Sequence, residues 1–164
     1  GADVLGTFMN YIDDEGQITG RKDMATSNER IRKTALFLNP INNATALVKT
    51  EVMRAFPYDA EIRRGHDYVL WARLVVAGKR LENLPEYLYD CRLGSDFLQR
   101  RKRQYFEVER KAKWILVAVY PWYLRPVVAV VALVMPFFRL LPPWCLRFVY
   151  ALRNAMRSRP ASPE

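Results

Sequence analysis

The sequence is poor in the residue types that most often carry enzyme chemistry. Its 164 residues include one histidine, two cysteines and no glycine-rich phosphate loop. Cys91 and Cys145 lie far apart without a CxxC pair, so we interpret them as reduced, incidental thiols. His66 cannot form a metal site by itself, and no signal peptide is visible. These absences exclude a disulfide framework and predict no metal ligands within this chain.

Acidic residues are scarce in the second half of the chain. Residues 1–91 carry 12 Lys and Arg against 13 Asp and Glu, a net of −1, whereas residues 92–164 carry 14 against 4, a net of +10. Such a basic region can meet nucleic acid or an anionic membrane. Nucleic-acid binders interleave basic and aromatic residues on a polar surface. Here arginines interrupt long apolar runs, which favours a membrane surface as partner and not nucleic acid.

The first 95 residues contain short strand and helix patterns, which predict an α/β fold. The predicted strands cover residues 2–12, 17–19, 46–48, 80–84 and 87–92. The predicted helices cover residues 27–38 with Ser27 or Asn28 as cap, 51–56 with Thr50 as cap, and about 67–78, ending at Gly78. Asp13–Gly16 is expected to form a hairpin turn, since Asp and Gly tolerate the backbone angles it needs. Pro85-Glu86 is expected to form a second turn between the last two strands.

The second half predicts helices of a different character. A basic helix is expected over residues 96–118, followed by uncharged runs over 114–124 and 126–138 that only Arg125 separates. A membrane-spanning helix needs about 20 apolar residues, and prolines interrupt both runs. The pattern is compatible with one kinked span or with a re-entrant or interfacial pair.

Residues 144–157 predict an amphipathic helix. Its arginine-rich face opposite a Trp/Phe/Leu face suits a membrane interface; the alternative is that the helix packs against its own domain. Residues 158–164 are expected to be disordered. The sequence thus divides into an α/β part (1–95), a membrane-associating part (96–157) and a tail (158–164).

Asp67 is the leading candidate for a catalytic residue. It stands at the start of an apolar helix, where a carboxylate commonly caps free amides and complements the helix dipole. An ionised carboxylate there can also accept a proton from an alcohol, as general-base catalysis requires. Residue type alone slightly favours the structural interpretation. His66, beside it, could orient a ligand or be a solvated loop residue.

Two further groups of polar residues are candidates for ligand binding. The amides of Asn39, Asn42 and Asn43 could grip sugar hydroxyls or simply close turns. Arg100 and Arg101 belong to a basic run that could contact a phosphate or lipid head group, although most such runs are solvated faces.

The order of these motifs resembles the bacterial family 2 glycosyltransferases, and in its later part the exopolysaccharide enzymes of the amylovoran-biosynthesis type. The matching segments are Asp3–Thr7 with Ile12-Asp13, Asn39–Thr45, Gly65–Trp71, Leu84–Glu86 with Leu88-Tyr89, Arg92–Asp96 with Arg100-Arg101, and Leu141–Trp144 with Tyr150. The resemblance covers nearly the whole chain.

The resemblance implies a GT-A fold with a short mixed sheet, and inverting sugar transfer of the hexosyltransferase class. It implies a nucleotide-sugar donor, a lipid-linked or saccharide acceptor, and a divalent metal, Mg or Mn. The base of the family's Glu-Asp motif falls on Asp67, with His66 in place of the Glu. The family's Asn-Pro-Ile-x-His-Pro loop has Asn43-Ala44 in place of His-Pro. These departures concern the acceptor more than the reaction type.

The nucleotide-binding strands and the Asp-x-Asp metal motif of that family have no counterpart in this sequence. The first residue is Gly1, and the residues after it already resemble the interior of a strand. We therefore expect the acceptor-side portion of a glycosyltransferase, inactive alone, at the cytoplasmic face of the bacterial inner membrane. The competing hypothesis is a non-catalytic, basic and amphipathic membrane-surface module.

Overall fold

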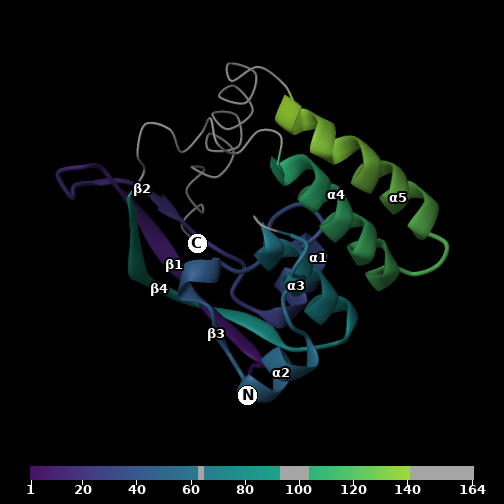
Figure 1. Ribbon diagram of the computed structural model, residues 1–164, viewed down its shortest axis with the longest axis horizontal. Helices are drawn as coiled ribbons and strands as arrows, with labels where there is room; N and C mark the ends of the chain where they lie inside the picture. Colours follow the sequence, from purple (N-terminus) through teal and green to yellow (C-terminus); the bar gives the residue numbers. More distant parts are fainter. Residues whose placement is uncertain (63–64, 93–103, 141–164) are drawn as a thin grey trace, which may run out of the picture.

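The computed structural model describes residues 1–62, 65–92 and 104–140. A four-stranded sheet lies on one side of this part of the chain, and the larger helices gather on the other (Figure 1). The elements in chain order are β1 (Val4–Ile12), β2 (Ile18–Lys22), α1 (Asn28–Thr34), β3 (Leu47–Val48), α2 (Thr50–Ala55), α3 (His66–Val76), β4 (Leu81–Arg92), α4 (Gln104–Leu116) and α5 (Arg125–Val134). This arrangement confirms the predicted α/β class.

Strand β1 lies at the centre of a mixed sheet. Strand β4 runs parallel to it and pairs along it from Val4 to Ile12. Because β4 takes one whole edge of β1, the two antiparallel partners share the other edge: β3 lies opposite Val4 and Leu5, and β2 opposite Met9 to Ile12. Strand β1 therefore joins three segments that are far apart in the sequence.

Strand β4 corrects one prediction. The sequence predicts two strands separated by a turn at Pro85-Glu86, but residues 81–92 form one strand. The register against β1 steps from Leu84 opposite Thr7 to Tyr87 opposite Phe8, so it skips Pro85 and Glu86. Proline lacks the N–H that a ladder needs, and the skipped pair forms a bulge that bends the strand without reversing it.

The predicted hairpin between β1 and β2 is confirmed. The Asp13 side chain accepts a hydrogen bond from the backbone N–H of Gln17 at 2.7 Å. Gly16 adopts a positive φ of 83°, which residues with a Cβ rarely adopt. Asp13 thus belongs to the turn, as its neighbourhood in the sequence predicts.

Two short helices differ in detail from the prediction. Ser27 caps α1 as expected, accepting from the Arg30 N–H, but the helix ends at Thr34 and not at residue 38. Thr50 is not a cap: it is the first residue of α2, and Lys49 occupies the cap position without a side-chain hydrogen bond.

Helix α3 forms the centre of the core. Seven of its residues are buried, among them Trp71, which is fully enclosed. A helix buried around most of its circumference needs neighbours on more than one side. Residues of the sheet such as Val4 and Leu81 meet it in one hydrophobic cluster, and α4 packs along it. The helix ends at Val76 with Ala77 as its cap, and Gly78 follows with φ of 73°, which confirms the predicted stop.

Helices α4 and α5 extend this core outward. Val108, Ala112 and Leu116 of α4 and Val128 and Ala132 of α5 belong to the same cluster as α3. Helix α5 lies beside α4, on the side away from the sheet (Figure 1). No helix within residues 1–62, 65–92 and 104–140 is long and apolar enough to cross a membrane. The predicted elements over 144–157 and 158–164 lie outside the described residues.

A buried lysine lies where these helices meet. The Lys113 side chain on α4 is fully enclosed. Its Nζ donates to the Leu36 carbonyl, lies 3.3 Å from a Glu109 carboxylate oxygen, and stands 6.0 Å from the centre of the Tyr68 ring. Removing an ammonium group from water disfavours its charged form, and burial lowers the pKa of Lys113 from 10.5 to about 8.

This lysine predicts a pH-dependent stability. Between pH 8 and 10.5 the unfolded chain binds more protons at Lys113 than the folded chain does, so the free energy of unfolding should rise with pH. We expect the free energy of unfolding of wild type, relative to that of Lys113→Met, to increase by roughly 2–3 kcal/mol from pH 7.5 to 10. Urea denaturation at several pH values measures it, with the exposed Lys111→Met on the same helix as control. A difference independent of pH would contradict the burial effect.

Candidate functional site

The site is built where the start of helix α3 meets the loop after α1. Asn39 Nδ2 donates a hydrogen bond of 2.8 Å to Asp67 Oδ2, joining residues 28 positions apart. Asp67 is half-buried in the first turn of α3. The hydrogen bond fixes the orientation of the carboxylate, and the first-turn amides of the helix favour a negative charge there.

Gly65 lets α3 begin in this position. It occupies the cap position with φ of 72°, in the left-handed region. A Cβ at this residue would lie about 3.1 Å from side-chain atoms of Tyr105 and Val108 on α4. A glycine is therefore needed both for the backbone angle and for the close approach of α4 to the start of the helix.

His66 and Tyr58 complete one side of the site. Their rings meet edge to face, with centres 4.7 Å apart, and the Tyr58 hydroxyl donates to Asn43 Oδ1 at 3.0 Å. Burial, and secondarily the negative charge of Asp67, raises the pKa of Tyr58. The structure thus brings four predicted residues, Asn39, Asn43, His66 and Asp67, into one cluster around Tyr58.

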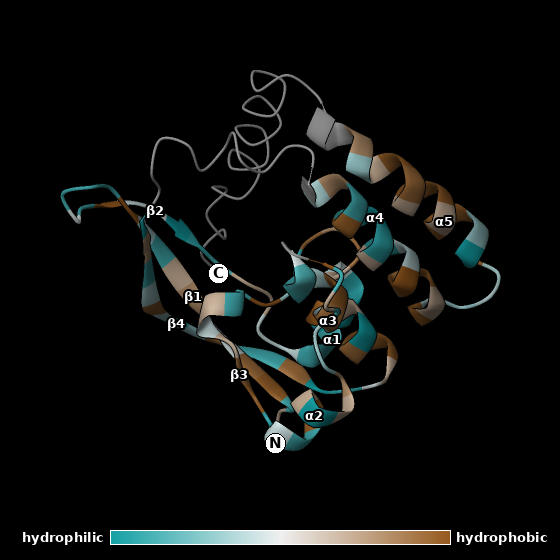
Figure 2. Cartoon of the chain, in the orientation of Figure 1, coloured by the Kyte–Doolittle hydropathy of each residue, from teal (hydrophilic) through white to brown (hydrophobic). Residues whose placement is uncertain are grey.

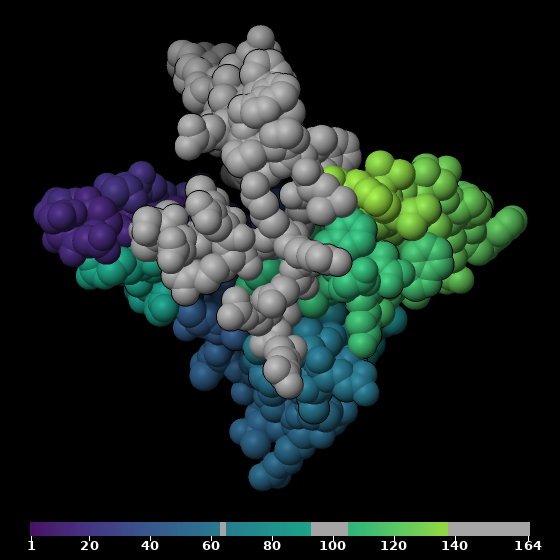
Figure 3. Space-filling view, turned by 45° about the horizontal axis from the view of Figure 1, so that its top comes forward, coloured from purple at the N-terminus to yellow at the C-terminus, as the bar shows by residue number. Residues whose placement is uncertain are grey.

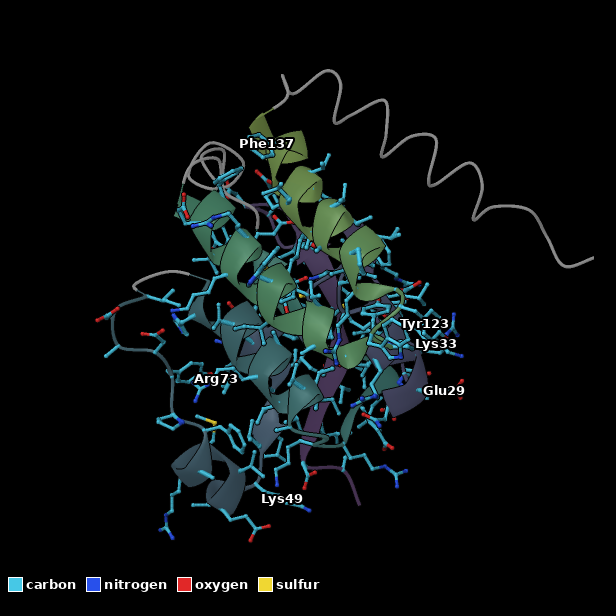
Figure 4. The ribbon with its side chains drawn as sticks, turned by 90° about the vertical axis from the view of Figure 1, so that its right-hand side faces the viewer. Glu29, Lys33, Lys49, Arg73, Tyr123 and Phe137 are labelled. Atoms are coloured by element: carbon cyan, nitrogen blue, oxygen red, sulfur yellow. The ribbon has the colours of Figure 1, made fainter. Side chains whose placement is uncertain are left out.

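The loop that carries Tyr58 is anchored on two helices. Arg73 of α3 donates to the Pro57 carbonyl at 2.9 Å, and Lys111 of α4 forms an ion pair of 2.6 Å with Asp59. Figure 4 shows Arg73 on the side of the molecule where this loop runs. Sequence reasoning did not identify Tyr58 as a site residue, because nothing in its neighbourhood marks it; only the fold brings it to Asp67.

Asn42 is buried, and its side chain bonds to the sheet. It is 6% exposed; its Nδ2 donates to the Thr7 carbonyl at 3.1 Å, and its Oδ1 accepts from Lys22 at 2.6 Å. These bonds hold the loop to β1 and β2. Of the three asparagines predicted for acceptor binding, Asn39 contacts Asp67, Asn43 contacts Tyr58, and Asn42 contacts the sheet.

A buried asparagine supports the loop from the sheet side. Asn83 on β4 donates to the Ala25 carbonyl at 2.8 Å and to the Pro40 carbonyl at 3.0 Å, directly beside Asn39. A Cβ on Gly6 would lie only 2.3 Å from the Asn83 Oδ1. A glycine inside a strand signals such a close approach, and Gly6 is the sequence signal that could have found this support.

The Asn39 side chain has further hydrogen-bonding capacity. Its Oδ1 is buried and accepts no hydrogen bond from any residue that the structure describes. A buried acceptor without a donor is unfavourable. A hydroxyl that entered the site beside Asp67 could satisfy it.

The remaining predictions on site residues fall outside this geometry. Arg100 and Arg101 lie outside the described residues. Across residues 1–62, 65–92 and 104–140, no three His, Cys, Asp or Glu side chains come close enough together to hold a metal ion. The described part therefore does not offer a ligand set for the divalent metal that the resemblance implies.

Comparison with known proteins gives one match to a curated protein. The chain is 33% identical over 82 residues to the amylovoran biosynthesis glycosyltransferase AmsE of Erwinia amylovora. The match covers 49% of this chain and spans 30% of the length of that relative. No protein-family model matches the chain, and no solved structure matches it. The relative is a glycosyltransferase, the class that the sequence motifs resemble.

Proposed function

We propose that this chain is the acceptor-side part of an inverting family 2 glycosyltransferase of the GT-A type, acting in surface polysaccharide biosynthesis. The observation that carries the proposal is the Asp67 carboxylate, held by Asn39 at the start of α3 and flanked by His66 and Tyr58. The similarity to a polysaccharide glycosyltransferase supports the same reaction class.

In the proposed reaction Asp67 acts as general base. It accepts the proton of an acceptor hydroxyl while that oxygen attacks the anomeric carbon of the donor sugar. The bond from this carbon to the nucleoside diphosphate breaks as the new glycosidic bond forms, and the configuration inverts. The Nδ2 of Asn39 keeps the Asp67 carboxylate aligned. The Oδ1 of Asn39 can accept a hydrogen bond from a second hydroxyl of the acceptor sugar. His66, Tyr58 and Asn43 form the wall beside this hydroxyl.

The donor side of the reaction is proposed to lie in sequence outside this chain. The chain spans 30% of the length of the relative it matches, and the implied divalent metal would take its ligands mostly from that other part. The acceptor is proposed to be membrane-borne, either lipid-linked or a saccharide. The basic second half would hold the enzyme at the cytoplasmic face of the bacterial inner membrane.

A transfer assay tests this function. We expect the whole protein to move label from one of a panel of UDP-, GDP- and TDP-sugars into a bacterial lipid extract. We expect the isolated 164-residue chain to give no transfer, because it holds neither the nucleotide diphosphate nor its metal. Turnover by the isolated chain would contradict the proposed division of the site. No transfer by the whole protein across the panel would instead favour a non-catalytic membrane-surface module.

A further inference from the structure

The outward face of helix α5 is apolar and open to solvent. Val128 and Ala132 are buried against the core, whereas Val127, Val130 and Val134 on the outer side are 65%, 60% and 47% exposed. After Arg125 and Pro126 the helix contains only valine, alanine and leucine. Figure 2 shows it as hydrophobic along most of its length, and Figure 3 shows α5 forming the rim of the molecule. A helix that is apolar all round normally has apolar neighbours all round.

Aromatic residues extend this face beyond both ends of the helix. Trp122 and Tyr123 precede α5 and are 79% and 62% exposed, and Phe137 follows it at 51%. Figure 4 shows Tyr123 and Phe137 at opposite ends of the helix. We name the set Trp122, Tyr123, Val127, Val130, Val134 and Phe137 the α5 surface. Tryptophan and tyrosine are the residues enriched where a membrane meets water.

The sequence that contains α5 carries charge of a single sign. Residues 110–163 contain nine Lys and Arg and no Asp or Glu. Arg125, at the start of α5, is exposed and lies next to the aromatic pair Trp122 and Tyr123. Among the described residues, Arg110, Lys111 and Lys113 pair with carboxylates, so it is the exposed charge of Arg125 at this face that favours an anionic partner. Anionic lipid complements both properties of the face, because it offers apolar chains to the valines and negative charge to the arginine.

We propose that the α5 surface docks on an anionic lipid bilayer, with α5 lying in the interface plane. The ten residues of α5 reach about 15 Å, roughly half the thickness of the hydrocarbon layer, so the helix lies on the membrane and does not cross it. An apolar helix face beside aromatic residues and flanking basic residues is the pattern of interfacial binding. This inference rests on the membrane-borne acceptor of the proposed function and names the surface that would reach it.

Cysteine accessibility tests which partner covers the surface. In a Cys91→Ser, Cys145→Ser background, Val130→Cys should react rapidly with a maleimide when no vesicles are present. Vesicles of phosphatidylcholine and phosphatidylglycerol at 3:1 should slow the reaction about tenfold or more, and high salt should weaken the protection. Leu88→Cys on β4, also well exposed, should stay reactive. Slow labelling without vesicles would mean that another segment of the chain covers the face. Slow labelling that depends on protein concentration would mean that a second copy covers it, and either result overturns the proposal.

Vesicle sedimentation tests the apolar contribution directly. Val127→Gln, Val130→Gln and Val134→Gln together leave the charge unchanged. They should lower partitioning to the same vesicles by about tenfold or more, since three valine side chains that would enter the bilayer are lost. Ile18→Gln, Leu47→Gln and Leu88→Gln, which change exposed apolar residues of the sheet, should leave binding unchanged. Equal losses in the two variants would overturn the proposal. The assay needs neither donor nor acceptor, so its failure leaves the transferase proposal standing, and the reverse also holds.

Discussion

Replacing Asp67 with asparagine should lower sugar transfer by the whole protein by about a hundredfold or more. The loss of a positioned general base removes a factor of this size from the rate. Asparagine has nearly the same shape and can still accept the hydrogen bond from Asn39 Nδ2, so the local structure should persist. Binding of the donor nucleotide should be unchanged, because Asp67 is assigned to the acceptor side.

The matched control for this variant is Asp59→Asn. Asp59 lies in the neighbouring loop, which the Arg73 hydrogen bond to the Pro57 carbonyl also holds, and its partly exposed ion pair with Lys111 contributes little to stability. Transfer by Asp59→Asn should therefore be close to normal. Near-normal turnover by Asp67→Asn, measured with saturating donor, would remove Asp67 from the role of base. An equal loss in both variants would show that the charge of this region matters and not one carboxylate.

Gly6→Ala should destabilise the chain by about 2–4 kcal/mol. The new Cβ would lie 2.3 Å from Asn83 Oδ1 and 3.0 Å from the Ile41 side chain. Overpacking in a buried place costs about 1–3 kcal/mol, and displacing Asn83 would also weaken its bonds to the Ala25 and Pro40 carbonyls, each worth about 1 kcal/mol. Urea denaturation of the 164-residue chain measures the change.

Gly20→Ala on β2 provides the control for Gly6→Ala. A Cβ there would meet only a Tyr11 ring atom, at an ordinary contact distance of 3.5 Å. Its effect should stay below about 1 kcal/mol. Combining Gly6→Ala with Asn83→Ala should cost less than the sum of the two single changes, because the clash disappears with the amide. Equal stability of Gly6→Ala and Gly20→Ala would contradict the assigned role of Gly6.

The sequence predicted local structure well where local chemistry decides it. The hairpin at Asp13–Gly16, the cap at Ser27 and the stop at Gly78 are confirmed, since each depends on one side chain or one glycine. The prediction failed at β4, because Pro85 signals a turn and only the neighbouring strand shows that the chain continues past it. The end of α1 and the cap of α2 failed for a related reason: propensity gives element ends only approximately.

For the site, the sequence identified candidate residues, and the fold shows which of them contact Asp67. Asn39, Asn42 and Asn43 are equivalent candidates as residue types, yet Asn42 is held by Thr7 and Lys22 while Asn39 contacts Asp67. Tyr58 and Asn83 carried no local signal, because partners such as Asn43 for Tyr58 and Pro40 for Asn83 lie elsewhere in the sequence. Such long-range pairings depend on the packing of the whole sheet and helix layer.

The amino-acid sequence was sufficient to predict the α/β class, the turn and helix stops, the separation of charge between the two halves, and the position of Asp67 at the start of a helix. These properties follow from residue type, spacing and composition, which act locally or add over a segment. Three further properties emerge only in the folded chain: which asparagine contacts that carboxylate, that α4 and α5 join the same core as α3, and which side of α5 stays exposed. Each of these depends on which apolar faces bury one another, and that is settled only when the elements pack together.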